Sequence, residues 1–265
     1  MRVIVTGADG FIGGVMVDVF NEAGWDVSRW TKDNQPTNLL DVQYIVHCGE
    51  NIPAKNGDGD PKYAGNIGAM QRILLFAEKS NITRICNLSS MDAFGAITAP
   101  VVDHETPSES PNNYGSAKLI NESMLEKWTQ AGRSAVSIRL PGVIGKGAHH
   151  NFLSKAMASI LNEQTIHAHS PDALFNNVIH VRDLARFVVH LHHAIPMGHQ
   201  VVTVGCSGPV KMCDVVERLI SVSGKKAARV SWMPGTSGFL IGYGMAESLG
   251  YKPQSTYSTV GRILE

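Results

Sequence analysis

The stretch RVIVTGADGFIGG, residues 2–14, decides the fold. It opens with a short run of β-branched residues that predicts a buried strand over 2–6. Gly7, Gly10 and Gly13 follow in the spacing GxxGxxG, and apolar residues then recur with helical spacing. A strand, a glycine-rich turn and a helix in this order are typical of a dinucleotide-binding site.

Each glycine has its own physical reason in such a turn. Gly7 permits the tight turn, Gly10 lets the backbone approach a pyrophosphate, and Gly13 lets the helix pack on the strand. The amides at the start of the helix then face the phosphates. We therefore expect cofactor contacts from Gly7, Gly10, Phe11, Ile12 and Gly13; a tight turn without a ligand is the alternative.

The rest of the chain alternates between short β-branched runs and longer amphipathic stretches. Strands are expected over 25–30, 44–49, 84–90, 135–140 and 200–204, and helices over 12–24, 63–79, 113–131, 151–162, 183–193 and 211–223. This alternation predicts an α/β fold with a Rossmann-like doubly wound parallel sheet. We expect a large NAD(P)-binding domain over 1–147, rejoined by 178–205, and a smaller C-terminal substrate-binding lobe made of 148–177 and 206–265.

The end of the second strand bears on the choice between NAD and NADP. An acidic residue there binds the ribose hydroxyls of NAD, but Asp26 stands too early in the strand. Arg29 and Lys32 stand near its end instead, and such cations pair with the 2′-phosphate of NADP. The sequence favours NADP, with NAD as the alternative. Only 31–43 separate this strand from the next, which leaves the adenine side short or open.

The composition limits the classes of partner. Lys+Arg and Asp+Glu both number 23, so the formal net charge is zero, which argues against nucleic acid or an anionic membrane as the main partner. The four cysteines form no CxxC pair, and no apolar run reaches membrane-spanning length. The first strand begins too early for a signal peptide, so we expect a cytoplasmic protein. The histidines lack the spacing of a zinc site, and no metal is expected.

Further motifs follow the glycine turn in order along the chain. They are IVHCGE (45–50), Asn66, NLSSMDAFG (87–95), YGSAK (114–118), RLPGVIGKG (139–147), VIHVRDLA (178–185) and LGYKPQS (249–255). Together they resemble the extended short-chain dehydrogenase/reductases of the NAD(P)-dependent epimerase/dehydratase family, whose members modify nucleotide sugars. The resemblance covers nearly the whole chain.

The resemblance implies an acid–base site. Tyr114 would exchange a proton with a sugar or alcohol oxygen, and Lys118, one helical turn later, would bind the nicotinamide ribose and lower the pKa of the tyrosine. Ser90 would hydrogen-bond the same oxygen, with Ser89 as the fallback. Asp92 stands where some branches of the family carry a second acid/base; a loop carboxylate that caps backbone amides is the alternative.

The resemblance also implies contacts beyond the acid–base site. Pro141 and Val143 would approach the nicotinamide. Gly142 stands where many nucleotide-sugar enzymes carry Asn, which weakens the assignment of that substrate class. Contacts with the substrate are expected from Ser90, Asp92, Lys146, His149, His150, Asn177 and Arg182. A polar surface loop is an equally good interpretation of Lys146, His149, His150 and Asn151.

Three functions are compatible with these residues. The leading hypothesis is an NADP-dependent oxidoreductase that reduces a nucleotide-linked 4-keto-6-deoxy sugar, with Tyr114 as acid/base. The second is an NAD-dependent nucleotide-sugar epimerase or dehydratase, which Asp92 favours. The third is a redox-inert NADP-sensing regulator, against which the complete Ser-Tyr-Lys set argues. The resemblance further implies a homodimer.

Overall fold

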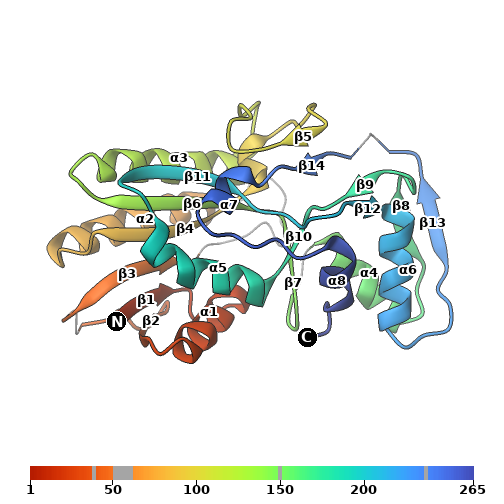
Figure 1. The fold of residues 1–265 in the computed structure, drawn as a ribbon, viewed down its shortest axis with the longest axis horizontal. Helices are drawn as coiled ribbons and strands as arrows, with labels where there is room; N and C mark the ends of the chain where they lie inside the picture. Colours follow the sequence, from red (N-terminus) through yellow and green to blue (C-terminus); the bar gives the residue numbers. More distant parts are fainter. Residues whose placement is uncertain (38–39, 50–61, 149–150, 236–237) are drawn as a thin grey trace.

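A parallel sheet of six strands forms the centre of the larger part of the molecule (Figure 1). The computed structural model describes residues 1–37, 40–49, 62–148, 151–235 and 238–265, and within them the strand order is β11-β6-β4-β3-β1-β2. The strands are β1 (Arg2–Thr6), β2 (Asp26–Trp30), β3 (Val42–His47), β4 (Arg84–Ser90), β6 (Ser134–Leu140) and β11 (Gly198–Thr203). All pairings in this sheet are parallel, which confirms the Rossmann-like fold.

The strand order reverses at β1. Its two neighbours are β2 on one side and β3 on the other, so that Val3 lies opposite both Val27 and Tyr44. Residues 31–41 between β2 and β3 are too few for another helix and strand, so β2 stays at the edge of the sheet. Ligands of open α/β sheets bind at the carboxyl ends of the strands beside such a reversal.

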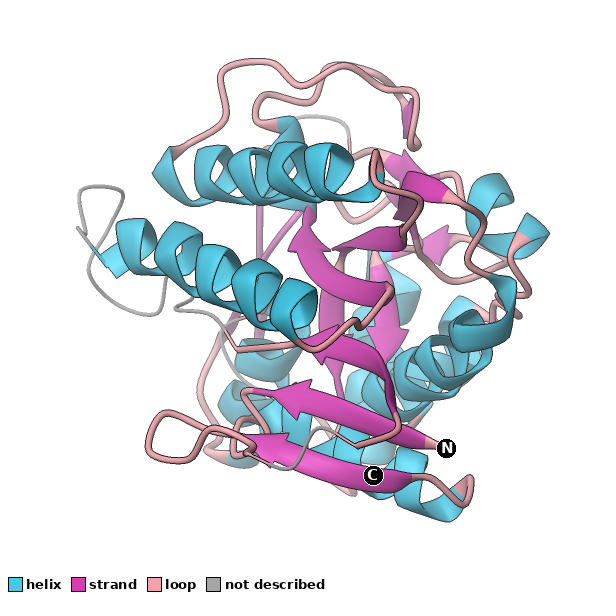
Figure 2. Ribbon diagram, turned by 90° about the vertical axis from the view of Figure 1, so that its left-hand side faces the viewer, coloured by secondary structure: helices cyan, strands magenta, loops and turns pink. Residues whose placement is uncertain are grey.

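Helices cover both faces of the sheet (Figure 2). One face carries α2 (Lys62–Lys79) and α3 (Asn113–Thr129), and the other carries α1 (Phe11–Glu22) and α5 (Val181–Ala194). Met70 and Leu125 are fully buried on the first face, and Phe20 and Leu184 on the second. A sheet covered on both faces explains why the strands read as continuous apolar runs in the sequence.

The smaller lobe lies beside the sheet (Figure 1) and contains a second hydrophobic cluster. Leu153, Leu219 and Val260 are buried there. The lobe contains α4 (Phe152–Leu161), α6 (Met212–Val222), α8 (Thr256–Gly261) and the strand pairs β8 (Ile166–His169) with β13 (Val230–Met233) and β9 (Leu174–Phe175) with β12 (Val210–Lys211). The parallel pair β7 (Gly142–Ile144) and β10 (Val178–His180) lies between the two parts.

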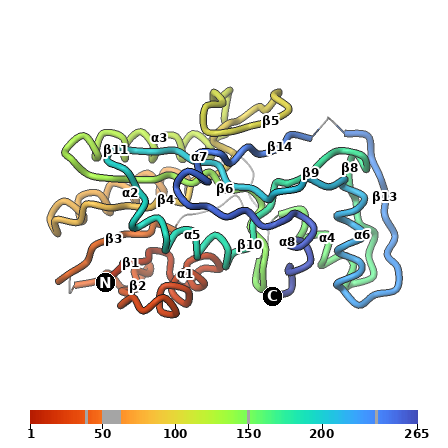
Figure 3. The backbone as a smooth tube through the Cα atoms, viewed as in Figure 1, coloured from red at the N-terminus to blue at the C-terminus, as the bar shows by residue number. Residues whose placement is uncertain are grey.

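The domain boundary expected at 206–265 needs one correction. After β14 (Leu240–Ile241), which pairs with β5 (Val101–Val102), the chain returns past β11 as α7 (Gly244–Ser248) (Figure 3). Ala246 and Tyr251 join the buried cluster of the sheet, and the rings of Tyr251 and Phe187 lie 5.1 Å apart. Residues 243–251 therefore pack on the large domain because their apolar side chains are buried there.

The cysteines and the helices add two observations. No disulfide joins the four cysteines, all of which lie in the described ranges, and Cys86 is buried in β4. Among the helices of the described ranges, none combines the length and apolar character that a membrane crossing needs.

Candidate active site

The turn after β1 requires glycine at two of the three predicted positions. Gly7 has a φ of +64°, and a Cβ there would lie 2.5 Å from Cα of Gly49. A Cβ at Gly13 would overlap the carbonyl oxygen of Gly7, so the helix packs directly on the turn. A Cβ at Gly10 would lie 3.2 Å from the same oxygen, a tight contact that needs a small shift, so the protein alone demands glycine there less strictly.

The start of α1 fits an anion. Gly10 is the N-cap residue and has no side chain, so no cap stands between the first turn, at Phe11 and Ile12, and a ligand. The amides of a helix N-terminus and its dipole favour a phosphate group. The glycine cradle and this uncapped helix start together suit the pyrophosphate of a dinucleotide.

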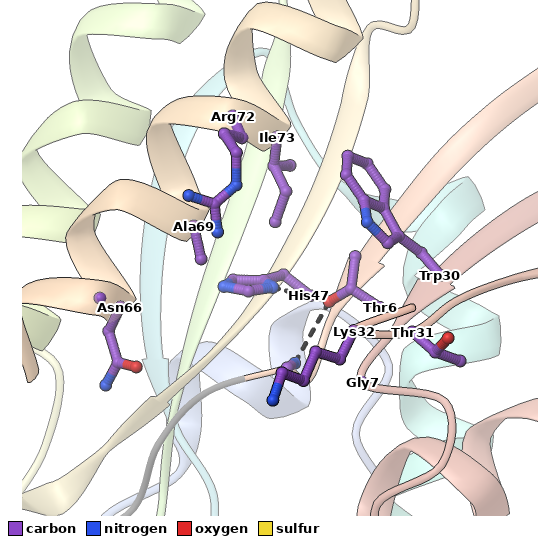
Figure 4. A pocket seen from close by; sticks show the side chains of 12 residues that line it. Thr6, Gly7, Trp30, Thr31, Lys32, His47, Asn66, Ala69, Arg72 and Ile73 are labelled. Carbon is purple, nitrogen blue, oxygen red and sulfur yellow. Dashed lines mark hydrogen bonds between the residues drawn. The ribbon is translucent and has the colours of Figure 1, made fainter. Parts of the chain in front are cut away.

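A cavity of about 380 Å³ lies beside this turn, at the carboxyl ends of β1, β2 and β3 (Figure 4). It is lined by Thr6, Gly7, Trp30, Thr31, Lys32, His47, Gly49, Gly65, Asn66, Ala69, Arg72 and Ile73. Lys32 enters from the loop after β2 and Arg72 from α2, while no carboxylate stands among these described lining residues. The cavity is therefore suited to a negatively charged group.

Arg29, which was expected to pair with a 2′-phosphate, is not among the described residues that line this cavity. Its Nη2 donates to the carbonyl oxygen of Ala8 at 2.8 Å and to Oδ1 of Asp9 at 2.7 Å. The residue alternates away from Trp30 along β2 and faces the glycine turn, which it ties to the strand. Of the two predicted cations, Lys32 alone lines the cavity.

The sequence prediction missed Arg72 and the floor of the cavity. Asn66, Ala69 and Ile73 recur at three- and four-residue spacing, which places one face of α2 on the cavity, and Arg72 adjoins that face. His47 is buried, and its Nδ1 lies 2.7 Å from Oγ1 of Thr6. The helical spacing was visible in the sequence, but its orientation toward the end of β2 was not.

The predicted acid–base pair lies on the first two turns of α3. Asn112 caps this helix, because its Oδ1 accepts a hydrogen bond from the amide of Gly115 at 2.7 Å. Tyr114 and Lys118 are only 6% and 3% exposed. Nζ of Lys118 donates to the carbonyl oxygen of Leu88 at 2.6 Å and lies 5.3 Å from the centroid of the Tyr114 ring. The structure thus brings both residues together and fixes the lysine on β4.

Ser90 and Asp92 are bonded to each other at the end of β4. The hydroxyl of Ser90 donates to Oδ2 of Asp92 at 2.8 Å and accepts from the amide of Asp92 at 3.1 Å, which caps the short 3-10 helix η1 (Met91–Phe94). A Cβ at Gly115 would overlap the carbonyl oxygen of Asp92. This glycine lets η1 rest on the first turn of α3, so all four predicted catalytic residues come from two touching segments.

A buried polar cluster behind this site was also missed. Ser89 and Arg139 both donate hydrogen bonds to the carboxylate of Glu122 beneath α3. Glu122 stands one helical turn after Lys118, and this spacing was visible in YGSAKLINE, but its partner on β6 was not.

The predicted contacts near the nicotinamide and the substrate fall in different places. Pro141 precedes β7, and Val143 within it accepts a hydrogen bond from Asn151 at 2.9 Å. A Cβ at Gly142 would lie 3.5 Å from the backbone of Asn177. Oδ1 of Asn177 is buried and has no hydrogen-bond partner within the described ranges. A buried acceptor in this state is a suitable contact for a donor on a ligand.

The other predicted substrate contacts are Arg182, Lys146, His149 and His150. The guanidinium of Arg182 pairs with the carboxylate of Glu22 on α1, with Nη2 at 2.7 Å from Oε1, and its contact with a substrate stays a prediction. Lys146 is exposed and lines a separate cavity of about 220 Å³ beside α4 and Ile263. His149 and His150 lie outside the described residues.

His180 is buried three residues after Asn177. It begins α5, where its Nδ1 accepts from the amide of Arg182 at 3.3 Å and lies 3.1 Å from Nη2 of Arg262. Burial lowers the pKa of His180, and Arg262 lowers it further. Across the described ranges, no group of three or more His, Cys, Asp or Glu side chains is placed to hold a metal ion.

Comparison with known proteins places this geometry in context. The model of the family described as "NAD dependent epimerase/dehydratase family" matches residues 3–205. A "Putative UDP-glucose 4-epimerase" of Methanocaldococcus jannaschii is 26% identical over 155 residues, which are 48% of this chain and 51% of the relative. The matched stretch thus spans about half the length of that relative.

Solved structures share the fold over nearly the full length. The UDP-Glc/GlcNAc 4-epimerase of Campylobacter jejuni has a TM-score of 0.83 at 15% identity, over 99% of this chain and 97% of that one. RMD from Pseudomonas aeruginosa, solved with NADPH, has a TM-score of 0.81 at 18% identity over the same shares. The UDP-glucose 4-epimerase of Thermus thermophilus, solved with NAD, has a TM-score of 0.79 at 17% identity, again over 99% and 97%.

Proposed function

Because the chain belongs to the NAD-dependent epimerase/dehydratase family, we propose that it is an NADP-dependent oxidoreductase that reduces a nucleotide-linked 4-keto-6-deoxy sugar. The observation that carries the proposal is the charge of the 380 Å³ cavity, to which Lys32 and Arg72 contribute cations and no described lining residue contributes a carboxylate. The adenosine ribose of a bound dinucleotide lies at the end of the second strand in this fold. Two cations there suit a 2′-phosphate.

The chain's own residues then divide the work of the reduction. A bound nicotinamide supplies the hydride that converts the keto carbon to an alcohol. Tyr114 donates the proton that the carbonyl oxygen takes up, and Lys118 stabilises the phenolate that remains. Ser90 donates a hydrogen bond to the same oxygen, and to do so its hydroxyl gives up the hydrogen bond to Asp92. The glycine turn and the start of α1 hold the pyrophosphate.

A nucleotide sugar is the proposed substrate because similar proteins carry the names UDP-glucose 4-epimerase and UDP-Glc/GlcNAc 4-epimerase. The buried Oδ1 of Asn177 offers an acceptor for one donor of that substrate near β7. Lys146, on the neighbouring loop, offers a positive charge for the diphosphate of that substrate.

Two other functions remain as alternatives. The hydrogen bond between Ser90 and Asp92 favours an NAD-dependent nucleotide-sugar epimerase or dehydratase, because it places a carboxylate beside the acid–base pair. A redox-inert NADP-sensing regulator is the third, and the presence of both Tyr114 and Lys118 speaks against it.

Nucleotide binding and turnover test these functions in order. We expect the purified protein to bind NADPH more tightly than NADH in a fluorescence titration. We then expect a UDP-linked 4-keto-6-deoxy sugar to drive NADPH oxidation. Tighter NADH binding, together with conversion of UDP-glucose without net cofactor oxidation, would move the assignment to the epimerase. Binding of NADPH without turnover of any keto sugar would favour the regulator.

A homodimer is proposed through α2 and α3. Leu75 on α2 is 57% exposed and Ile120 on α3 is 43% exposed, both large apolar side chains on adjacent helices. We expect the double variant Leu75→Glu, Ile120→Glu to elute as a monomer in size-exclusion chromatography with light scattering. A wild-type protein that is itself monomeric contradicts this part of the proposal.

A further inference from the structure

A buried ion pair lies one helical turn beyond the proposed acid–base pair. Glu122 of α3 accepts from Nε of Arg139 at 3.1 Å and from its Nη2 at 2.8 Å. The Arg139 and Glu122 side chains are only 8% and 7% exposed. Ser89 donates a third hydrogen bond to Oε1 of Glu122 at 2.6 Å. Water screens such a pair weakly, so each charge acts strongly on its neighbours.

Lys118 is one of those neighbours. It stands four residues before Glu122, and side chains at this spacing share a helix face with their Cβ atoms about 5–6 Å apart. Both residues are bound to consecutive positions of β4, Lys118 to the carbonyl oxygen of Leu88 and Glu122 to the hydroxyl of Ser89. The ammonium and the carboxylate therefore lie along the same strand.

We propose that Arg139 is a positioning residue for the proton transfer. Arg139 neutralises the charge of Glu122 and so keeps the ammonium of Lys118 directed at Leu88 and Tyr114. Without Arg139, the buried carboxylate attracts the ammonium one turn away and draws it from the tyrosine. The inference rests on the proposed function, because that function assigns the proton transfer to Tyr114.

Arg139 also reaches the other half of the site. Its guanidinium carbon lies 4.3 Å from the centroid of the Phe94 ring, at the end of η1. A cation over an aromatic face is attracted to it. One side chain of β6 thus contacts both α3, which carries Tyr114, and η1, which carries Asp92.

Other titratable groups face this part of α3. Tyr63 of α2 has its ring 5.6 Å from that of Tyr114, Asp92 approaches from η1, and His199 approaches from β11. Burial lowers the pKa of His199, and Glu122 and Glu126 oppose that effect. All of these groups except Glu122 are retained in the variants below, so differences among the variants report on Glu122 and Arg139.

Ionisation of Tyr114 tests the proposal without any substrate. Tyrosinate absorbance is followed in an alkaline titration of the full chain, and the same titration of each protein with Tyr114→Phe added is subtracted. We expect Arg139→Met to raise the midpoint by about one pH unit or more, because Lys118 no longer stabilises the phenolate. Adding Glu122→Gln to Arg139→Met should restore the wild-type midpoint. Ser89→Ala removes a hydrogen bond but no charge and should leave it unchanged.

Two results overturn the proposal. One is an equal midpoint in Arg139→Met and the wild type; the other is a shift that Glu122→Gln fails to reverse, because lost packing is not repaired by removing a charge. If Arg139→Met does not fold, the double variant decides alone: its neutral pair must give the wild-type midpoint, and a shift of about one unit or more refutes the proposal. Failure of the proposed function is distinct, since it shows as full turnover in Tyr114→Phe.

Discussion

The two ends of the proposed cofactor site are built in different ways. At the acid–base end, Tyr114 and Lys118 are buried, and Lys118 is bonded to the backbone of β4. At the adenosine end, Lys32 and Arg72 are exposed, one on a loop and one on a helix surface. Arg29, which lies close to this end, is by contrast tied to Asp9 by an ion pair.

The difference follows from the two tasks. Proton transfer depends on distances fixed to a fraction of an ångström, so its residues are held by buried hydrogen bonds. Recognition of a phosphate needs positive charge within reach, which long exposed side chains supply. Substitutions at the first end should therefore change turnover, and those at the second end should change affinity.

Tyr114→Phe should have the largest effect. We expect kcat to fall by roughly 100- to 10,000-fold, because the proton donor is lost, while the Kd for NADPH stays within about twofold. Steady-state kinetics and fluorescence titration measure the two quantities. Tyr63→Phe is the matched control, since Tyr63 contacts the same ring from α2 and should keep most of the activity. An equal loss of kcat in Tyr114→Phe and Tyr63→Phe would contradict the specific role of Tyr114 at the acid–base end.

Gly13→Ala should destabilise the turn that joins both ends. The added Cβ would overlap the carbonyl oxygen of Gly7, and we expect the free energy of unfolding to fall by about 2–3 kcal/mol in urea denaturation. Gly14→Ala is the control, because its Cβ has no atom closer than the carbonyl oxygen of Ala8 at 3.7 Å. We expect it to stabilise α1 by about 0.5–1 kcal/mol. Similar stabilities in the two variants would contradict the close packing.

Arg72→Leu should act on affinity alone. We expect the Kd for NADPH to rise about tenfold and the Kd for NADH to stay unchanged, because a charge-assisted hydrogen bond to the 2′-phosphate is lost. Arg29→Leu should affect the two nucleotides equally, since Arg29 binds the glycine turn. If Arg29→Leu reduces the preference for NADPH over NADH more than Arg72→Leu does, Arg29 rather than Arg72 binds the 2′-phosphate.

A smaller effect concerns the stability of the protein in acid. We expect it to depend on His192, which lies at neither end of the proposed cofactor site. His192 is buried against Trp25 and Tyr44, and burial lowers its pKa to about 4. His192 binds a proton more readily in the unfolded chain than in the folded one. The stability that neutral, buried His192 provides is therefore complete above about pH 6.5 and is lost as the pH falls toward 4. We expect the free energy of unfolding to decrease over that interval. In His192→Phe, the melting temperature should fall less between pH 6.5 and pH 4 than in the wild type. An equal fall in both proteins would assign the acid sensitivity to another group.

Local patterns in the sequence were sufficient for most of the fold. The strand at 2–6 and the strand at 84–90 have the predicted limits, and the helix predicted over 63–79 starts one residue earlier. Gly7 and Gly13 were predictable because backbone geometry dictates their identity. The direct connection from β2 to β3 was predictable from the few residues between these strands.

Partnerships between distant residues were not predictable in this way. The position of Arg29 in the sequence does not reveal that its guanidinium binds Asp9, and nothing local links Glu122 to Arg139. Arg182 follows a strand as a substrate contact would, but the approach of α1 gives it Glu22 as a partner. Such pairings depend on how helices and strands meet, which single-sequence periodicity does not specify.

The return of residues 243–251 to the sheet has a consequence for folding during synthesis. Ala246 and Tyr251 complete the buried cluster that includes α1, yet the ribosome makes them more than two hundred residues later. The nucleotide-binding core therefore remains incomplete until the chain of the lobe has been made. Domains usually fold one after another as they emerge. In this protein the order of the chain instead couples completion of the first domain to synthesis of the second.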